Sequence, residues 1–335
     1  MPRIRLLIAA LLALSATSCS VFSGDSDNSP LIVYSGRSES LVGPIIEEFE
    51  AETGIDVDVR WGSTSEMAAT LLEEGENTPA DVFFAQDPGG LGAVIDLLAP
   101  LPEDITTAVD PKFHAPDGRW VGVSGRARVI VFNTENLAAE ALPSSIEELT
   151  DPQWNGRIGW APTNSSFQTM VTAMRALWGE ERTREWLTGL LENNPIQYES
   201  NTPTVAAVGA GEVDLGLVNH YYLYRFLAEE GETFPARNLF LGDGGPGSLV
   251  MVAGVGQLEQ SDNAEKAQEF IRFLLSTEAQ EYFSSETNEY PLAGGVQPNP
   301  DLPPLSTLNP PAVDLADLAD LRGTVALLQE VGALP

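Results

Sequence analysis

The stretch from Leu215 to Phe226, LGLVNHYYLYRF, gathers most of the unusual chemistry of this 335-residue chain. It holds three of the 7 tyrosines and one of the 2 histidines. Its first half predicts a buried strand, and the apolar residues of its second half recur at helical spacing. Tyr221 and Tyr222 therefore stand where a strand passes into a helix. Adjacent side chains on a strand point to opposite faces, whereas at such a turn they can converge on one ligand.

Two converging phenols suit a hard, highly charged cation. A phenol ionises near pH ~10, but a bound metal supplies the positive charge that removes its proton. The phenolate oxygen is then a hard anionic ligand for a cation such as ferric iron. The competing interpretation is packing, because tyrosine buries a large ring and satisfies its hydroxyl with a hydrogen bond. Taken alone, this stretch favours packing.

The N-terminus predicts export. Arg3 and Arg5 precede a nine-residue apolar run, Leu6 to Leu14, which is too short to span a bilayer and fits a signal peptide. Small residues then lead to Cys19, a pattern that resembles a bacterial lipoprotein signal with Cys19 as the lipidated residue. We expect residues 1–19 to be the signal ending at this anchor and 20–30 to be a flexible tether. The alternative is an ordinary secreted protein with an incidental cysteine, which as the only one can form no internal disulfide.

Charge and length limit the function classes. The chain has 17 basic and 49 acidic residues, a net charge of −32. Such a surface repels nucleic acid and anionic membranes, so we expect no nucleic-acid partner and membrane contact only through the anchor. We also expect a monomer. The residues after the tether are numerous enough for two lobes with their own cores.

Strand and helix patterns alternate from Leu31 onward, which predicts an α/β fold with parallel strands. Ligands of such folds bind at the carboxyl ends of strands. A proline-rich segment, Val296 to Pro311, predicts an extended strap followed by short acidic helices. The expected strands include 31–34, 55–61, 81–85, 120–132, 157–161, 213–218 and 250–255, and the expected helices include those opening at Ser63 and Asn164 and those over 183–191, 202–210, 263–275 and 278–283.

Six motifs together resemble one family, the bacterial ferric-iron-binding lipoproteins that serve ABC importers. The motifs are LIVYSGR (31–37), ADVFFAQD (80–87), VGVSGRARVIVFN (121–133), GRIGWAPTNSSF (156–167), GLVNHYYLYRF (216–226) and NEYPL (288–292). The resemblance implies a two-lobed type 2 periplasmic-binding-protein fold, with two sheets, flanking helices and hinge strands that join the lobes. It places residues 31–125 and 243–295 in lobe 1, 126–242 in lobe 2, and 296–335 in a strap and helices packed on both.

The resemblance also implies a ligand set. Tyr221 and Tyr222 match the family's paired iron-binding tyrosines. The positions that match the cradle of a synergistic anion, phosphate or carbonate, are Asn164, Ser165, Ser166, Asn201 and Asn219. Physical chemistry supports the first three, because they open a helix whose free amides attract an anion, although plain N-capping explains them too. Asn201 and Asn219 are also typical of turns or caps. Arg126, which shares a strand face with Arg128, is either a further anion contact or part of a salt bridge.

The first lobe departs from the pattern of some relatives. Ser38, preceded by Arg37, stands where they have a histidine ligand, and Gln86, followed by Asp87, stands where they have a glutamate. Either Gln86, Asp87 and water complete the iron sphere, or the anion and a further protein oxygen do. Arg37 and Ser38 are additional candidate anion contacts. We interpret His220 as a packing residue.

The expected function is capture of ferric iron outside the cytoplasm and its delivery to an ABC permease and ATPase. One alternative keeps the fold but binds an oxyanion or an organic cation boxed by Tyr221, Tyr222 and Trp160. A lipid-anchored hydrolase is the weaker alternative, because the sequence has no Gly-x-Ser-x-Gly elbow and no histidine-rich metal motif. We therefore expect no enzyme activity.

Overall fold

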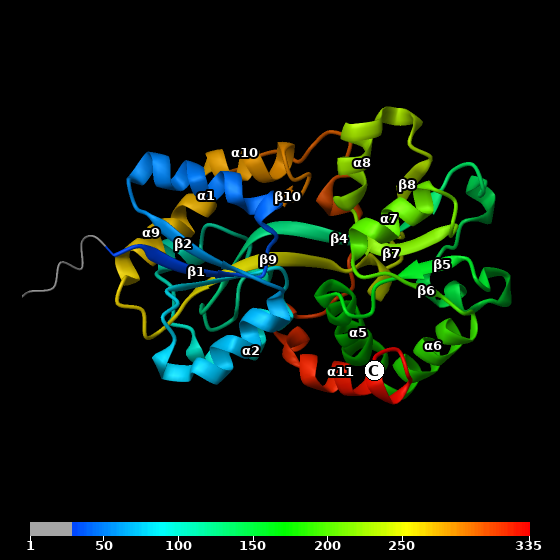
Figure 1. Cartoon of the computed structure of the whole chain (residues 1–335), viewed down its shortest axis with the longest axis horizontal. Coiled ribbons are helices and arrows are strands. Elements are labelled where there is room, and N and C mark those ends of the chain that lie inside the picture. Colours follow the sequence, from blue (N-terminus) through cyan, green and yellow to red (C-terminus); the bar gives the residue numbers. More distant parts are fainter. Residues whose placement is uncertain (1–28) are drawn as a thin grey trace, which may run out of the picture.

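The computed structural model describes residues 29–335. The predicted signal peptide, Cys19 and most of the predicted tether lie outside the described residues. The described chain forms two halves side by side, with long strands running between them (Figure 1). Within residues 29–335, no helix combines the length and apolar character needed to cross a membrane.

The strands of the described chain form one hydrogen-bonded order, β2-β1-β3-β9-β4-β7-β5-β6, with β8 and β10 also paired to β4. β1 is parallel to β2 and β3, and β5 is parallel to β6 and β7, whereas β4 and β9 run antiparallel to their neighbours. The predicted α/β class is therefore confirmed. The strands are β1 (Leu31–Ser35), β2 (Val57–Trp61), β3 (Val82–Ala85), β4 (Val121–Asn133), β5 (Ile158–Trp160), β6 (Ile196–Gln197), β7 (Leu215–Asn219), β8 (Ala236–Leu239), β9 (Val250–Gln257) and β10 (Tyr290–Pro291).

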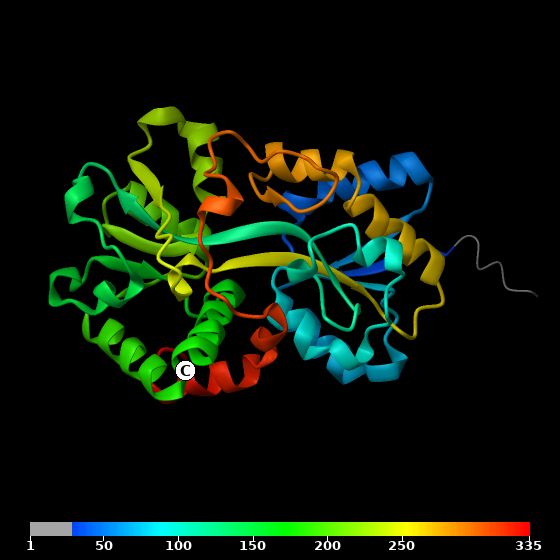
Figure 2. The same ribbon diagram turned by 180° about the vertical axis from the view of Figure 1, so that it is seen from behind.

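Helices cover the strands of each half (Figures 1 and 2). α2 begins with the predicted capping box, in which Ser63 and Glu66 exchange side-chain and backbone hydrogen bonds. α1 ends at Gly54, whose φ of 72° suits a glycine. The helices are α1 (Glu39–Thr53), α2 (Thr64–Glu74), α3 (Pro88–Ala93), α4 (Glu103–Thr106), α5 (Ser165–Trp178), α6 (Glu180–Glu192), α7 (Asn201–Gly209), α8 (Tyr222–Glu230), α9 (Ala264–Leu274), α10 (Thr277–Ser285) and α11 (Leu321–Glu330).

β4 belongs to both halves of the molecule. It pairs with β9 up to Ala127, which lies opposite Val250, and with β7 from Arg128, which lies opposite Asn219. The sequence predicts two sheets joined by hinge strands. In the structure, the strands of both halves are hydrogen-bonded in one continuous series, because the 13-residue strand β4 runs through both sheets. The assignment of residue ranges to lobes stays a prediction.

The C-terminal strap crosses the back of β4 and β9 (Figure 2). After it, a 3₁₀ turn, Leu315–Ala319, packs against both α3 and α5, and α11 packs on α5. The hydroxyls of Thr172 and Thr324 lie 2.7 Å apart in this buried contact. The expected pair of short acidic helices is therefore one 3₁₀ turn and one α-helix, and together they contact both halves.

Two glycines inside helices should respond differently to alanine. At Gly209 in α7, a Cβ would lie 2.2 Å from a ring carbon of Phe234, so Gly209→Ala should destabilise the fold by about 1–3 kcal/mol. At Gly43 in α1, the nearest atom to a Cβ outside the adjoining residues lies 3.5 Å away. The gain in helix propensity at Gly43, about 1 kcal/mol, is offset because Pro44 disfavours helical backbone in the residue before it, so Gly43→Ala should change stability little. Urea unfolding of both variants measures the difference, and equal midpoints would contradict the packing described here.

Candidate functional site

Tyr221 and Tyr222 lie at the junction of β7 and α8, as the sequence predicts. Tyr221 precedes the helix and Tyr222 is its first residue. Their rings stack with centroids 4.3 Å apart and an interplanar angle of 28°. Tyr221 is 1% exposed, and its hydroxyl has no hydrogen-bond partner in the described chain. A buried polar atom without a hydrogen-bond partner is costly, so the Tyr221 hydroxyl is a candidate ligand-binding group.

The Tyr222 phenol is protonated in the absence of a cation. Burial raises the pKa of Tyr222 above its ordinary value of 10.0, and the neighbouring Tyr221 raises it further. Asn201 and the positive charge of Arg126 act in the opposite direction but do not reverse the shift. Ionisation of this pair therefore requires a positive charge placed directly at the oxygens.

His220 packs edge-on against the Tyr221 ring, with centroids 5.7 Å apart, and both of its ring nitrogens contact backbone. The Ala127 amide donates to Nδ1 at 3.1 Å, and Nε2 lies 2.8 Å from the Asn288 carbonyl oxygen. Because an amide only donates and a carbonyl only accepts, the imidazole is neutral with its proton on Nε2. Burial lowers the pKa of His220 to about 4, which keeps it neutral. Both ring nitrogens are occupied, in agreement with the packing role expected of this residue.

Arg126 and Arg128 bring two uncompensated positive charges to the same place. They are 0% and 2% exposed, and neither forms an ion pair with a carboxylate of the described residues. The Nε and Nη2 atoms of both are buried without a hydrogen-bond partner. Burial lowers the pKa of Arg128 to about 9, and the charge of Arg126 adds to the effect. Buried charges are normally paired, so this arrangement calls for an anion.

The N-terminus of α5 meets these arginines. Asn164 caps the helix, since its Oδ1 accepts from the Ser166 amide at 3.0 Å and from Asn201 Nδ2 at 3.3 Å. Arg126 Nη1 lies 3.3 Å from Ser166 Oγ, and Arg128 Nη1 lies 3.0 Å from Asn219 Oδ1.

Asn219 Nδ2 in turn lies 3.1 Å from Ser166 Oγ. Of the predicted anion contacts, the structure thus brings together Asn164, Ser166, Asn201, Asn219 and Arg126. Ser165 lies beside them on the first turn of α5.

Of the two candidate iron ligands from the first half of the chain, Gln86 reaches the cluster around Ser166 and Asp87 makes other contacts. The Gln86 amide nitrogen lies 2.8 Å from Ser166 Oγ and so reaches the cluster. Asp87 instead caps α3 by accepting from the Gly90 amide, and its Oδ1 also accepts from Thr169 of α5 at 3.1 Å. Its carboxylate is therefore used in holding the two halves together.

Arg37 and Ser38 do not join the cradle. Arg37 donates two hydrogen bonds, of 2.9 and 2.8 Å, to the buried carboxylate of Glu289, which neutralises its charge. Ser38 is exposed at the start of α1, with its hydroxyl 3.5 Å from that of Ser40. The Arg37–Glu289 pair could not be predicted from the sequence, because the partners are 252 positions apart. Arg128 could have been nominated, since its spacing from Arg126 places both on one strand face.

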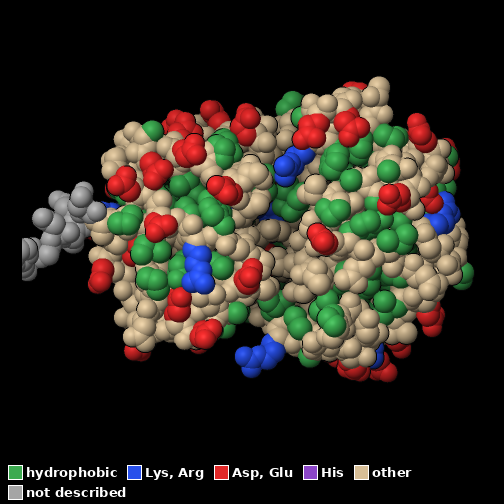
Figure 3. Space-filling model, viewed as in Figure 1, with side chains coloured by type: hydrophobic (Ala, Val, Ile, Leu, Met, Phe, Trp, Pro, Cys, Tyr) green, Lys and Arg blue, Asp and Glu red, His purple; other side chains and the backbone are tan. Residues whose placement is uncertain are grey.

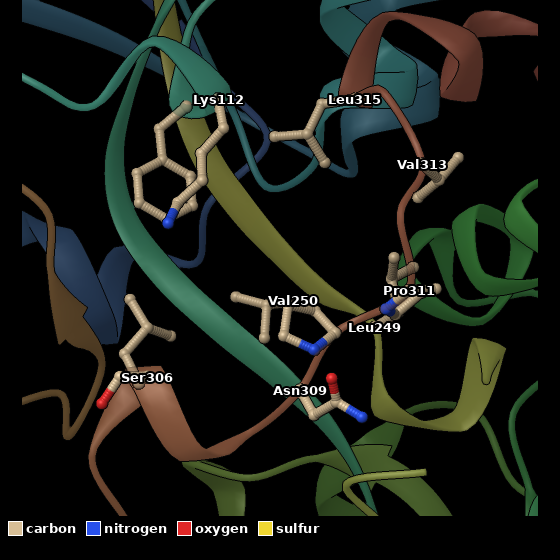
Figure 4. A pocket seen from close by; sticks show the side chains of 11 residues that line it. Lys112, Leu249, Val250, Ser306, Asn309, Pro311, Val313 and Leu315 are labelled. Atoms are coloured by element: carbon tan, nitrogen blue, oxygen red, sulfur yellow. The ribbon is translucent and has the colours of Figure 1, made fainter. Parts of the chain in front are cut away.

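The surface between the two halves is hollowed on the face seen in Figure 3. Ala127 packs with Leu302 and Leu308 of the strap, so by strand alternation the flanking arginines face the opposite side. A cavity of about 320 Å³ lies behind the hinge, between β9 and the strap (Figure 4). Its walls are mainly apolar side chains and prolines, with Lys112 from the first half, and it is separate from the tyrosines.

No cluster of three or more histidine, cysteine, aspartate or glutamate side chains within residues 29–335 is arranged to hold a metal. The phenols of Tyr221 and Tyr222 can become anionic when a cation removes their protons, and Arg126 and Arg128 carry the positive charge of the site. The arrangement can bind a hard cation and an anion together, because each offsets charge that the other leaves behind.

Comparisons with known proteins agree on one family. Residues 44–308 match the family of bacterial extracellular solute-binding proteins. The chain is 34% identical over 329 residues to the Fe(3+)-binding periplasmic protein of Serratia marcescens, covering 97% of each. It is 35% identical over 277 residues to iron uptake protein A1 of Synechocystis, covering 80% of this chain and 77% of that one.

Solved structures give the same result. Iron-bound HitA from Pseudomonas aeruginosa superposes with a TM-score of 0.87 at 35% identity, over 90% of this chain and 99% of that one. Trichodesmium IdiA (FutA), in complex with iron and citrate, gives 0.75 at 27% identity, over 91% and 99%. These neighbours are type 2 periplasmic binding proteins, so the predicted fold is confirmed.

The buried Arg37–Glu289 pair supplies a prediction about stability. Glu289→Gln leaves the guanidinium buried without a counter-charge, and should destabilise the fold by about 3–5 kcal/mol. Asp104→Asn removes a matched but exposed carboxylate that contacts Arg272, and should change stability little. Urea unfolding at neutral pH tests both. Similar midpoints for the two variants would refute the importance given to burial.

Proposed function

This chain belongs to the bacterial extracellular solute-binding proteins, and on that basis we propose that it captures ferric iron for an ABC importer. Its relatives from Serratia marcescens and Pseudomonas aeruginosa are an Fe(3+)-binding periplasmic protein and an iron-bound protein of the same fold. It is a binding protein and not an enzyme, as these relatives are. It works outside the cytoplasm, where ferric iron is the cargo.

The observation that carries the proposal is the pairing of two stacked phenols with two unpaired arginines. Ferric iron enters the cleft and displaces the protons of Tyr221 and Tyr222, whose phenolate oxygens become its ligands. Two phenolates leave the ferric ion with residual positive charge, and Arg126 and Arg128 add more. Reduction to ferrous iron removes one charge and weakens both bonds, which gives a route to release.

A synergistic oxyanion balances the remaining charge. The unpartnered Nε and Nη2 atoms of Arg126 and Arg128 can donate to its oxygens, and the N-terminal end of α5 favours negative charge. Phosphate and carbonate both have the oxygens this requires. Asn201 and Asn219 hold the surrounding network in place through Asn164 and Arg128.

The arginines count against an organic cation as cargo. Buried positive charges repel a second cation that brings no ligand of its own, and the proposed aromatic box is incomplete. The Trp160 ring packs edge-on against Phe167, with centroids 5.3 Å apart, and not against the tyrosines. A plain oxyanion binder is the second candidate, since the arginines alone would suit it. Colour separates the two, because ferric phenolate absorbs visible light and an oxyanion complex does not.

Delivery requires a membrane partner. We propose that the two halves close on the ion and present a joint surface to a permease, which an ATPase drives. The lipid anchor at Cys19 and the monomeric state belong to the same proposal.

Tyr222→Phe should abolish most iron binding while leaving the fold intact. The variant keeps the ring but removes one anionic ligand, so affinity should fall by more than ~100-fold, since losing even an outer partner of a metal ligand costs about 10–100-fold. Titration with ferric citrate, followed by visible absorbance, measures this. Tyr224→Phe is the matched control, because this tyrosine lies two residues further along α8 and donates to the Asp301 carbonyl instead. Equal affinity of the wild type and Tyr222→Phe would overturn the proposal.

A further inference from the structure

Gln86 is the point where the first half of the chain reaches the anion cradle. Its backbone amide donates to Thr64 Oγ1 at 2.9 Å, which fixes the residue at the end of β3. Its side-chain nitrogen lies 2.8 Å from Ser166 Oγ, across the cleft on the first turn of α5. The next residue, Asp87, contacts Thr169 one turn further along the same helix. The Gln86 amide is thus placed with little freedom to move elsewhere.

Three N–H donors converge on the Ser166 hydroxyl. They are Gln86 Nε2 at 2.8 Å, Asn219 Nδ2 at 3.1 Å and Arg126 Nη1 at 3.3 Å. The orientation of the Asn219 amide follows from Arg128, which can only donate and therefore faces Oδ1. A hydroxyl oxygen has two lone pairs, so it cannot serve three donors well. An anionic oxygen, with more lone pairs and a negative charge, satisfies this set better.

From this convergence we propose that Gln86 binds the oxyanion from the first half of the chain and is not an iron ligand. The inference rests on the proposed function and assigns one of its residues. A glutamate of the same shape could not donate and would repel an anion. The neutral amide can donate to it, and it adds no charge beside the iron.

The carboxylates near this cluster are held by contacts of the fold. Glu289 forms an ion pair with Arg37, and Asp87 accepts from Gly90 and Thr169 through Oδ1, while its Oδ2 is buried without a partner in the described chain. Glu289 cannot balance the iron without breaking its pair with Arg37. The oxyanion therefore links the two halves through Gln86 on one side and Arg126 with Arg128 on the other. Iron binding by this chain should depend strongly on such an anion.

The experiment compares wild type with Gln86→Glu, and uses Gln86→Ala as the variant that removes the amide without adding charge. Calorimetry of the iron-free proteins with inorganic phosphate, and in parallel with bicarbonate, measures anion binding directly. Each variant should lose roughly 10- to 100-fold in affinity for the preferred anion, the worth of one hydrogen bond to a charged group, with Gln86→Glu losing more. Phosphate and bicarbonate affinities equal to those of wild type would overturn the inference.

A second arm measures iron. Ferric nitrilotriacetate is titrated with and without the preferred anion, and visible absorbance is followed. The anion should strengthen iron binding by wild type but much less by Gln86→Glu, whose carboxylate takes the anion's place. Tighter iron binding by Gln86→Glu with the full anion effect retained would mark position 86 as an iron-ligand position and overturn the inference. If the wild type binds phosphate but shows no visible absorption band with ferric nitrilotriacetate, the proposed iron function is overturned. The calorimetry of the Gln86 variants still decides whether Gln86 binds the anion.

Discussion

The site depends on two buried arginines that have no carboxylate partner among the described residues. Arg126 and Arg128 stand in contrast to Arg37, which is equally buried but holds Glu289 with two hydrogen bonds. Removing a guanidinium from water is favourable only if an opposite charge or strong acceptors replace the solvent. Arg126 and Arg128 therefore favour a negatively charged partner between the halves. In the proposed mechanism, a ligand that supplies that charge binds a closed form better than an open one, and this difference shifts the population towards closure.

Arg126 and Arg128 lie on β4, the strand that joins the two halves, so a ligand bound to them would affect how the halves are positioned. β4 changes its pairing partner from β9 to β7 between Ala127 and Arg128. Strand alternation then directs Ala127 to the strap and both arginines to the cleft. The contacts of Gln86 with Ser166 and of Asp87 with Thr169 cross the same cleft. The groups that we propose to bind the anion thus lie beside contacts that join the two halves.

Local pattern was enough to predict the elements that present the site. The strand-to-helix junction at Tyr221 and the capped start of α5 at Asn164 both follow from residue types within a few positions of one another. The pairings across the fold could not be predicted in this way. Gln86 and Ser166 are 80 positions apart, and Arg37 and Glu289 are 252 apart, so no periodicity or capping rule links them. The spacing of Arg126 and Arg128 predicts that they share one strand face. The absence of a carboxylate partner among the described residues depends on the tertiary packing and could not be predicted from the sequence.

Under the proposed function, charge balance also gives the order in which the two ligands bind. Iron held by two phenolates retains positive charge, and placing it beside two unpaired guanidinium groups concentrates like charges in a poorly solvated cleft. A doubly charged oxyanion that binds first neutralises the guanidinium groups, and its further oxygens can then meet the metal. By linkage, iron must strengthen anion binding by the factor with which the anion strengthens iron binding. A site of this kind favours a small trivalent ion that can both deprotonate two phenols and share an anion, because a cation of lower charge gains less from each of these contacts.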